Sequence, residues 1–536
     1  MYVFPPAPGG GKRTNCTKLF KNNLNHEYTE FKNLTPNFYI FALQIHHSSF
    51  IIHHSSLYIV ELNQIKTIYF VGIGGIGMSA LARYFLSRGV AVHGYDKTET
   101  ELTRALATEG MLIHYTDDVS YIPEGVDLVV YTPAIPKEHT ELVCFQLNGF
   151  PILKRSEVLG IISRGMKCIA VAGTHGKTTT SSIVTHILRT GGVDATAFLG
   201  GISLSLGSNF VQGQSDWVVV EADEYDRSFL RLSPDIAIIT AIDPDHLDIY
   251  GDEENFRKGF HDFTKKVKDN GQVFPNSTLL LRGDDDDEQR HIRYDDYGVN
   301  AGVYRAENIR VESGFFVFDY KSPLGNIENI KFTLPGNHNV ENATAAIAAA
   351  QQIGVTSEAI KEALANFKGI KRRFEFILRR DLTSNILPIT HHPLPITNYP
   401  LPIFIDDYAH HPTELEAAIA ATKTLYPDKR ITGIFQPHLF TRTRDFQDGF
   451  AAALDKLDEV FLMDIYPARE LPIEGVTADI IFNKMKNPHK TLVTKQNLME
   501  TLRNRIYTEG VTFDVVMTLG AGDIDTFVKP IKELLS

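Results

Sequence analysis

A glycine-rich heptad, Gly173-Thr174-His175-Gly176-Lys177-Thr178-Thr179, follows an apolar run in the middle of the chain. In phosphate-binding loops, backbone amides hold the phosphates, a lysine reaches the β and γ oxygens, and the next hydroxyl ligates Mg²⁺. The heptad departs from the full G-x-x-x-x-G-K-S/T pattern, because Val171 stands at the position of the first glycine. We predict an ATP and Mg²⁺ site here, and a chance Gly-Lys-Thr sequence is the alternative.

A second glycine-rich turn, Gly72-Ile73-Gly74-Gly75-Ile76-Gly77, also follows an apolar run. It matches the G-x-G-x-x-G pattern, in which absent side chains let the backbone approach a pyrophosphate at a helix N-terminus. Asp96 ends the next predicted strand, where the partner of a ribose hydroxyl belongs. We predict that this turn binds a nucleotide diphosphate through Gly72, Gly74, Gly75, Gly77 and Asp96. Taken alone it favours a nicotinamide nucleotide, and a tight turn without ligand is the other alternative.

Acidic side chains and one histidine follow two further predicted strands. They are Glu221, Asp223 and Glu224 after one strand, and Asp243, Asp245, His246 and Asp248 after the next. The carboxyl ends of neighbouring parallel strands converge on a nucleotide, and Mg²⁺ takes a few protein ligands while keeping waters. We predict that Glu221 and His246, with Thr178, bind the metal, and that the other acids are supporting residues or solvated loop acids.

The elements that must position these residues alternate between apolar runs and amphipathic stretches, which is typical of βαβ units and parallel sheets. The helices are predicted at Gly77–Arg88, Lys177–Leu188 and Asn339–Gly354. The strands are predicted at Thr67–Val71, Val90–Tyr95, Cys168–Ala172, Trp217–Glu221, Ile236–Ala241, Gly433–Gln436, Glu459–Asp464 and Val515–Leu519.

The length of 536 residues indicates about three domains. We predict an α/β chain with domains over 65–166, 167–370 and 371–536. Residues 1–64 are irregular and are expected to be a disordered extension. The proline-dense stretch 384–402 is expected to be an extended insert, because proline at that density prevents a helix and pairs poorly in a sheet.

Composition excludes several classes of protein. The net charge of −12 argues against nucleic-acid binding, and no apolar stretch is long enough for a membrane helix. No signal peptide is evident, and the three widely spaced cysteines suit a reducing cytoplasm. The chain therefore carries two phosphate-binding turns in separate predicted domains. A dehydrogenase would leave the second turn unused and a simple ATPase the first, whereas a ligase acting on a nucleotide-linked substrate uses both.

The order of the motifs resembles the Mur ligase family over about residues 62–536. The motifs that carry the resemblance are Gly173–Thr179, Glu221–Asp226, Asp245-His246, Gly336–Asn342, Asp406–Glu414, Phe435–Arg444 and Leu519–Ile524. The resemblance implies a Rossmann-like domain for the UDP end, a central P-loop ATPase domain with a mostly parallel sheet, and a C-terminal Rossmann-like α/β domain that closes on the site.

Within the family, the motifs are most similar to members that join L-alanine to UDP-N-acetylmuramic acid. The resemblance implies an ATP-dependent amide-forming reaction through an acyl phosphate, in peptidoglycan precursor synthesis, by a monomer or weak homodimer. The alternatives are a ligase that attaches a tripeptide to the same sugar, a nicotinamide-dependent oxidoreductase, and a non-catalytic UDP-sugar sensor.

The resemblance also implies residue roles. Lys177 and Thr178 would serve the ATP phosphates and metal, and Glu221 and His246 would bind Mg²⁺. Asn339 and Asn342 would lie near adenine, while Arg373 and Asp407 would touch phosphate and ribose. Tyr408, His410, His438 and Arg442 would approach the nucleotide or the alanine, with His410 or His438 as a candidate base because imidazole titrates near neutrality.

Overall fold

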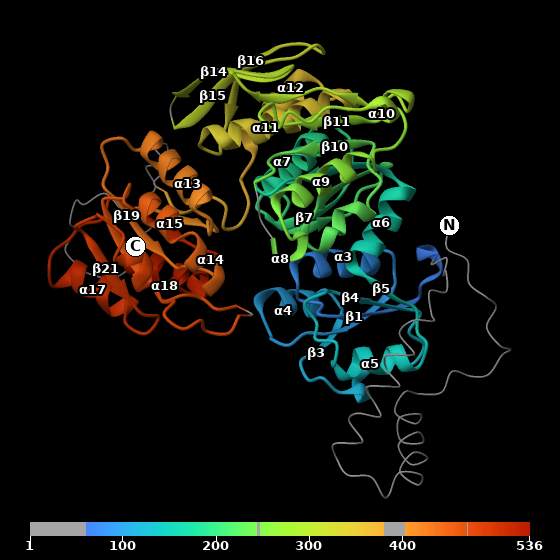
Figure 1. Cartoon of the computed structure of the whole chain (residues 1–536), viewed down its shortest axis with the longest axis horizontal. Helices are drawn as coiled ribbons and strands as arrows, with labels where there is room; N and C mark the ends of the chain where they lie inside the picture. Colours follow the sequence, from blue (N-terminus) through green and yellow to red (C-terminus); the bar gives the residue numbers. More distant parts are fainter. Residues whose placement is uncertain (1–60, 244–246, 313, 380–401, 469) are drawn as a thin grey trace, which may run out of the picture.

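The computed structural model describes residues 61–243, 247–312, 314–379, 402–468 and 470–536. The predicted extension over 1–64 lies outside the described residues as far as residue 60, and the predicted insert over 384–402 as far as residue 401. Within the described residues the chain forms four sheets. Figure 1 shows an N-terminal lobe (blue) below a central lobe (green to yellow), with a C-terminal lobe (orange to red) beside them. None of the described helices is long and apolar enough to cross a membrane.

The N-terminal sheet is parallel and has the order β3-β2-β1-β4-β5. Its strand β1 pairs β2 on one side and β4 on the other, so the strand order reverses there, and ligands of such sheets bind at the carboxyl ends of the strands beside this point. The strands are β1 (Thr67–Val71), β2 (Ala91–Tyr95), β3 (Leu112–His114), β4 (Leu128–Tyr131) and β5 (Ile152–Lys154). The helices are α3 (Ile76–Ser87), α4 (Glu101–Thr108), α5 (Thr140–Leu147) and α6 (Arg155–Gly165), with short turns η1 (Leu62–Gln64) and η2 (Val119–Tyr121).

The central sheet has the order β12-β11-β10-β6-β9-β7-β8 and is parallel except where β8 pairs β7. Its middle strands β6, β9 and β10 are apolar and buried, as expected when helices cover both faces. The strands are β6 (Lys167–Ala172), β7 (Thr196–Ser203), β8 (Ser208–Val211), β9 (Trp217–Ala222), β10 (Ile236–Ile239), β11 (Gln272–Pro275) and β12 (Arg293–Tyr294). The helical segments are α7 (Lys177–Thr190), η3 (Tyr225–Arg231), α8 (Leu247–Tyr250), α9 (Glu253–Thr264) and α10 (Asp285–Gln289).

A small sheet, β13-β14-β15-β16, lies at the end of the central lobe that is far from the N-terminal lobe (Figure 1). The sequence prediction missed it. Its apolar side chains, among them Phe316, Phe318 and Ile330, share one buried cluster with α11, whose alanines let it pack closely. The strands are β13 (Tyr297–Val299), β14 (Tyr304–Glu312), β15 (Phe315–Lys321) and β16 (Ile327–Phe332), and the helices are α11 (Asn337–Ile353) and α12 (Ser357–Asn366).

The C-terminal sheet has the order β17-β18-β22-β19-β20-β21 and is parallel except between β17 and β18. Alternate residues of β18 face two separate cores, Phe404 one of them and Ile405 the other, so both faces are covered. The strands are β17 (Glu375–Leu378), β18 (Ile403–Asp407), β19 (Ile431–Phe435), β20 (Glu459–Met463), β21 (Lys490–Val493) and β22 (Val515–Leu519). The helical segments are α13 (Pro412–Leu425), α14 (Phe440–Asp445), α15 (Gln447–Leu454), α16 (Asp479–Phe482), α17 (Leu498–Tyr507), η4 (Asp523–Phe527) and α18 (Val528–Leu535).

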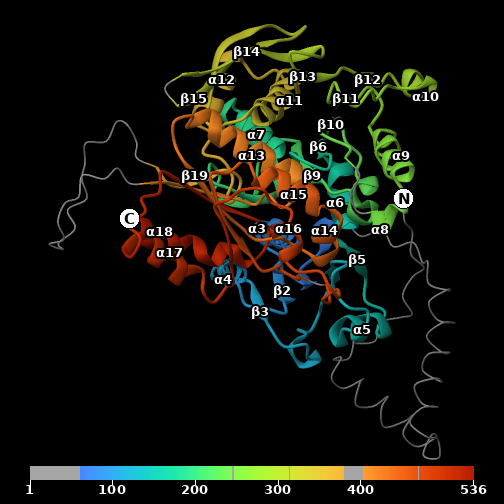
Figure 2. The ribbon, with the colours of Figure 1, turned by 60° about the vertical axis from the view of Figure 1, so that its left-hand side comes forward.

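The segment that links the central and C-terminal domains is tied to the central sheet. Lys371 N donates to Ile202 O at the end of β7 (2.8 Å), and Ile370 bridges both Ser203 and Arg373. When the molecule is turned by 60°, the C-terminal domain comes in front of the other two (Figure 2). The predicted fold class is confirmed, and the linker places residues 372–374 at the junction where the predicted nucleotide contacts meet.

Candidate active site

The glycine-rich heptad forms the turn between β6 and α7. Gly173 (φ +135°) and Gly176 (φ +80°) hold left-handed conformations that favour glycine. A Cβ on Gly176 would lie 2.5 Å from Asn342 Oδ1, and one on Gly173 would overlap Thr240. Thr174 N donates to Ala241 O (3.0 Å), which fixes the turn against the residues that follow β10. The turn therefore presents backbone amides at the N-terminus of α7, the arrangement that binds phosphate.

Lys177 is the first residue of α7, and its side chain folds back into the turn. Its Nζ donates to Gly173 O (2.6 Å) and forms an ion pair with the buried Glu224 carboxylate (2.8 Å). Burial opposes protonation, but the carboxylates of Glu224, Glu221 and Asp223 outweigh it and raise the pKa of Lys177. The loop thus holds a permanent cation beside its amides.

Glu221 ends β9 next to the heptad. Its Oε2 accepts a hydrogen bond from Gly200 N (3.0 Å), and a Cβ on Gly200 would overlap this carboxylate. Burial raises the pKa of Glu221, although Lys177 and Thr178 lower it. A partly buried carboxylate beside the buried hydroxyl of Thr178 offers the oxygen ligands that Mg²⁺ prefers, so these two residues fit the metal. His246, the other predicted ligand, lies outside the described residues.

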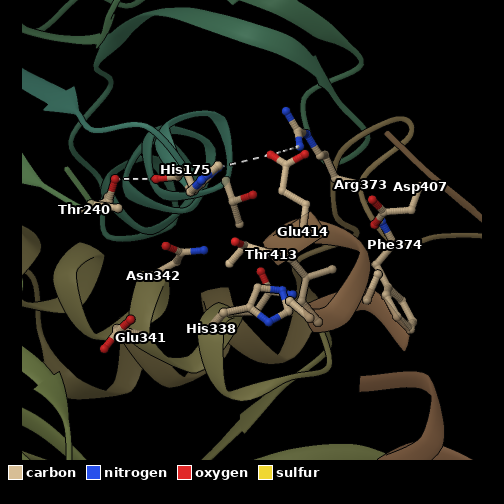
Figure 3. A pocket seen from close by; sticks show the side chains of 17 residues that line it. His175, Thr240, His338, Glu341, Asn342, Arg373, Phe374, Asp407, Thr413 and Glu414 are labelled. Carbon is tan, nitrogen blue, oxygen red and sulfur yellow. Dashed lines mark hydrogen bonds and ion pairs between the residues drawn. The ribbon is translucent and has the colours of Figure 1, made fainter. Parts of the chain in front are cut away.

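A cavity of ≈ 180 Å³ opens between the heptad, α11 and α13 (Figure 3). Asn339 and Asn342 lie on its α11 wall, both nearly buried; Asn342 Oδ1 accepts from Thr180 Oγ1 (3.2 Å) and Asn339 Nδ2 donates to Pro335 O (2.7 Å). His338 lies on the same wall. The lining residues are His175, Gly176, Thr179, Thr240, Ala241, Leu334, His338, Asn339, Glu341, Asn342, Arg373, Phe374, Asp407, Thr413, Glu414, Ala417 and Ala418.

A smaller cavity of ≈ 70 Å³ lies over the heptad itself. It is lined by residues 174–179, Glu221, Arg373 and Glu414, so it brings the predicted phosphate, metal and linker residues together. Asp407 lies in the larger cavity, and both of its oxygens accept backbone hydrogen bonds, from Phe374 N (2.7 Å) and Ala409 N (2.8 Å). Burial raises the pKa of Asp407 to about 6.

Tyr408, His410, His438 and Arg442 gather at the carboxyl ends of β18 and β19. His410 Nδ1 lies 2.9 Å from Tyr408 O, and its ring centroid lies 5.8 Å from that of His438. The His438 ring stacks on Tyr466, also at 5.8 Å. Burial lowers the pKa of His410, with Arg442 and Arg373 acting in the same direction against Glu414. The structure therefore brings these four predicted residues together and keeps His410 neutral near neutral pH.

The first glycine-rich turn joins β1 to α3. Asp96 Oδ2 accepts a hydrogen bond from Gly74 N (2.7 Å), and a Cβ on Gly74 would lie 2.8 Å from the same oxygen. Gly77 lies directly against the guanidinium of Arg155, and a cavity of ≈ 100 Å³ is lined by Gly77, Arg155 and Glu221 among others. The first turn and the carboxylate beside the second turn thus line one cavity between the N-terminal and central domains.

Three family models match consecutive stretches of the chain. The model described as the Mur ligase family, catalytic domain, matches residues 67–167. The Mur ligase middle domain matches residues 171–350, and the Mur ligase, glutamate ligase domain, matches residues 396–522. Together these matches cover more than half of the sequence.

The chain belongs to the Mur ligase family. It is 45% identical to a UDP-N-acetylmuramate–L-alanine ligase of Christiangramia forsetii, over 89% of this chain and 99% of the relative. It is 46% identical to the enzyme of that name from Cytophaga hutchinsonii, over 89% and 98% of the two chains.

Solved structures show the same architecture. The UDP-N-acetylmuramate-alanine ligase of Thermotoga maritima is 30% identical and superposes with a TM-score of 0.71, over 87% of this chain and 98% of that one. A murein peptide ligase of Psychrobacter arcticus, 23% identical, has a TM-score of 0.61 over 88% and 98% of the chains, a likeness that shows the fold alone.

Sequence reasoning missed the function of three residues of this Mur ligase site: Arg155 and Glu414 were given no role, and Glu224 was expected only among the supporting or solvated acids. Glu224 pairs with Lys177, Arg155 donates to Asp223 Oδ2 (2.8 Å) across the domain boundary, and Glu414 lies within 3.3 Å of His175. Glu224 and Glu414 stand inside quoted motifs, so the signal was present. Their partners lie 47 and 239 residues away along the chain, and sequence spacing does not indicate such pairs.

Proposed function

We propose that this chain is an ATP-dependent UDP-N-acetylmuramate–L-alanine ligase that acts in peptidoglycan precursor synthesis. It forms an amide between the lactyl carboxylate of UDP-N-acetylmuramic acid and L-alanine. Curated relatives of that name are 44–46% identical over nearly their full lengths. The observation that carries the proposal within this chain is the cavity that Gly77 of the first turn shares with Glu221 beside the second. A nucleotide-linked substrate held by the first turn would present its other end to the phosphate-binding loop.

The first step activates the carboxylate. A lactyl oxygen attacks the γ-phosphorus of ATP, which gives an acyl phosphate and ADP. We assign the amides of Gly173–Thr179, Lys177 and Arg373 to the phosphates, because phosphoryl transfer needs positioning and charge neutralisation. Asn339 and Asn342 would face adenine, and Asp407 would face the ribose, since each of its oxygens keeps a second lone pair.

The site fits Mg²⁺, which would be held by Thr178, Glu221 and His246. When bound, it neutralises phosphate charge. Desolvation disfavours the ionised form of Glu221, so this carboxylate needs a positive partner. Lys177 supplies part of that charge but is itself paired with Glu224.

The second step forms the amide. The neutral amine of L-alanine attacks the acyl carbon, and phosphate leaves from a tetrahedral intermediate. We assign His410 as the base that takes the amine proton, with His438 as the alternative. Because the carbonyl oxygen of Tyr408 can only accept, His410 Nδ1 carries the proton and Nε2 carries the lone pair. Tyr408 and Arg442 would help to position the alanine.

The first turn would bind the UDP end of UDP-N-acetylmuramic acid. We assign the amides of Gly72, Gly74, Gly75 and Gly77 to its diphosphate and Asp96 to its ribose. Water must be excluded while the acyl phosphate exists, since water would hydrolyse it. The C-terminal domain supplies Asp407, Thr413 and Glu414 to the cavity beside the heptad, so its closure would shield the intermediate.

Phosphate release by the purified full chain tests the proposal. The reaction would contain Mg-ATP and UDP-N-acetylmuramic acid, with L-alanine, with the tripeptide of the recycling reaction, or with neither. We expect release that needs L-alanine, with a UDP-sugar product heavier by one alanyl residue. Release with the tripeptide alone would identify the recycling reaction instead, and no release with either amine donor would refute ligase activity.

A further inference from the structure

Glu414 on α13 lies where three parts of the molecule meet. Its Oε1 lies 3.3 Å from His175 Nδ1 in the heptad and 3.8 Å from Arg373 Nη1 in the linker. Its Oε2 accepts a hydrogen bond from His410 N (3.0 Å) and lies 3.3 Å from His410 Nδ1. Figure 3 shows the carboxylate pointing away from α13 toward His175 and Arg373. One side chain therefore contacts the phosphate loop, the linker and the candidate base.

The same carboxylate forms part of the wall of the smaller cavity, which lies over the heptad. That cavity is otherwise lined by the heptad, Glu221 and Arg373. Burial opposes its ionisation, but His410, His175 and Arg373 hold the pKa of Glu414 well below its usual range, so it is an anion at neutral pH. A nucleotide phosphate placed over the heptad is also an anion. It would interact with Arg373 and the ring of His175, the same partners that the Glu414 carboxylate contacts. The two anions cannot share these partners without repulsion.

The charged and titratable groups around His410 come from several elements. Glu414 faces it from α13, Arg442 from α14 and Arg373 from the linker, and the His438 ring lies 5.8 Å away after β19. Glu414 is the anion among them, and it favours the imidazolium form that the two arginines oppose. The basicity of His410 therefore depends on how closely Glu414 pairs with it.

We propose that Glu414 is a positioning residue that competes with nucleotide phosphate for Arg373 and His175 and pairs more closely with His410 once phosphate holds these two partners. This inference rests on the proposed function. The inference implies an order of events: the nucleotide binds first, and His410 then becomes a stronger base. As the C–N bond forms, the amine proton passes to His410 Nε2, Glu414 neutralises the imidazolium, and phosphate leaves with the electrons of the C–O bond.

The variant Glu414→Gln separates this role from a purely structural one. The substitution removes an anion from the smaller cavity over the heptad. We expect it to lower the Kd for ATP, measured by calorimetry without alanine, by about threefold. Loss of the partner of His410 lowers kcat/KM for L-alanine by about tenfold or more. Glu416→Gln is the matched control, because Glu416 lies two residues away on the same helix, is exposed and pairs with Lys456. If Glu414→Gln weakens ATP binding as well, the competition is refuted.

The pH profile gives a second readout. Glu414 stabilises the protonated form of His410, so its removal lowers the pKa of His410. The base is active when neutral, and the acid limb of kcat/KM for L-alanine therefore moves to lower pH, by about one unit. An unchanged acid limb in Glu414→Gln would overturn the inference, whatever the size of the rate loss.

A third measurement tests the same link in the unmutated chain. The pKa of His410 would be followed by NMR of ¹⁵N-histidine protein, assigned with His410→Gln, without and with β,γ-imido-ATP and Mg²⁺. We expect the nucleotide to raise it by about one unit, and the rise to shrink in Glu414→Gln. No rise, or an equal rise in both proteins, refutes the inference. Formation of the alanyl product by the wild-type chain is judged separately, so failure here leaves the proposed ligase activity intact.

Discussion

The two glycine-rich turns share a strand-to-helix backbone but hold opposite charges. Both begin with a glycine at positive φ, Gly72 at +88° and Gly173 at +135°. In the first turn, the Asp96 carboxylate accepts a hydrogen bond from Gly74 N (2.7 Å). In the second, Lys177 Nζ occupies the turn and donates to Gly173 O (2.6 Å). The same local backbone geometry therefore holds a carboxylate in the N-terminal domain and an ammonium group in the central domain.

Because the two turns hold side chains of opposite charge, we assign them different roles. A carboxylate beside the amides suits the hydroxyl groups of a ribose, and the first turn itself, Gly72–Gly77, contains no counterpart of Lys177. A lysine followed by a buried hydroxyl suits phosphoryl transfer. The first turn would hold the substrate while the second carries out the chemistry, and Glu221 lies where the two meet.

The largest expected effect comes from removal of the cation of the second turn. We expect Lys177→Ala to lower kcat by roughly 10³-fold or more, because it deletes a major charge-stabilising donor. Steady-state phosphate release checks this, with Lys167→Ala as the control, since Lys167 is exposed and its ammonium lies at the surface beside Asp216 (3.0 Å) and the Trp217 ring (5.7 Å). A loss of less than tenfold would contradict the reacting role of the second turn.

A smaller effect is expected at the metal carboxylate. Glu221→Gln keeps an acceptor for Gly200 N but removes the charge, so we expect kcat to fall by about 10²-fold and the Mg²⁺ requirement to rise. Titration of activity against Mg²⁺ checks this. Glu254→Gln on the exposed face of α9 should behave like the wild type. An unaltered Mg²⁺ requirement in Glu221→Gln would remove this residue from the metal site.

A substitution in the first turn should affect the binding of UDP-N-acetylmuramic acid and leave ATP binding unchanged. A Cβ on Gly74 would lie 2.6 Å from Thr103 Cγ2 and 2.8 Å from Asp96 Oδ2, so Gly74→Ala must disturb the turn. We expect KM for UDP-N-acetylmuramic acid to rise by about tenfold while KM for ATP stays within about twofold. Gly165→Ala, with open space around its Cβ, is the control. Equal changes in both KM values would show that the two turns are not separable.

The smallest effect concerns stability in the domain of the first turn. Glu141 is buried against Tyr69 (2.6 Å), and burial raises its pKa to about 7. The folded domain therefore holds a proton that the unfolded chain releases, and stability falls as pH rises from about 4.5 to about 7. We expect the unfolding midpoint to drop less between about pH 5 and about pH 8 in Glu141→Gln than in the wild type. Parallel curves would show that Glu141 is not the titrating group.

Much of the fold could be predicted because its strands are apolar runs bounded by turn signals. β1 (Thr67–Val71) and β22 (Val515–Leu519) coincide with their predicted ranges. The predicted strand Ile236–Ala241 ends early, at Ile239, for a physical reason. Thr240 Oγ1 donates to His175 O, and Ala241 O accepts from Thr174 N (3.0 Å), so these two residues bind the heptad and do not extend the strand.

Other features could not be predicted, because distant parts of the chain create them. The small sheet β13–β16 is antiparallel over most of its length, and bulges interrupt its alternation near Asn308 and Asp319. Glu414 stood in a recognised motif, but its partners His175 and Arg373 reach it only after two domains have met. Local pattern therefore predicted the residue types of the site, while the ion pairs that orient them required the tertiary structure.

The fate of one oxygen atom tests the central claim most directly. UDP-N-acetylmuramic acid carrying ¹⁸O in both lactyl carboxylate oxygens would be converted by the full chain with Mg-ATP and L-alanine. If the first turn presents the carboxylate to the phosphate held by the second, each released phosphate carries one ¹⁸O and each amide product keeps one. Amide product formed together with unlabelled phosphate, with the second ¹⁸O released to water, would contradict the acyl phosphate and with it the joint use of the two turns.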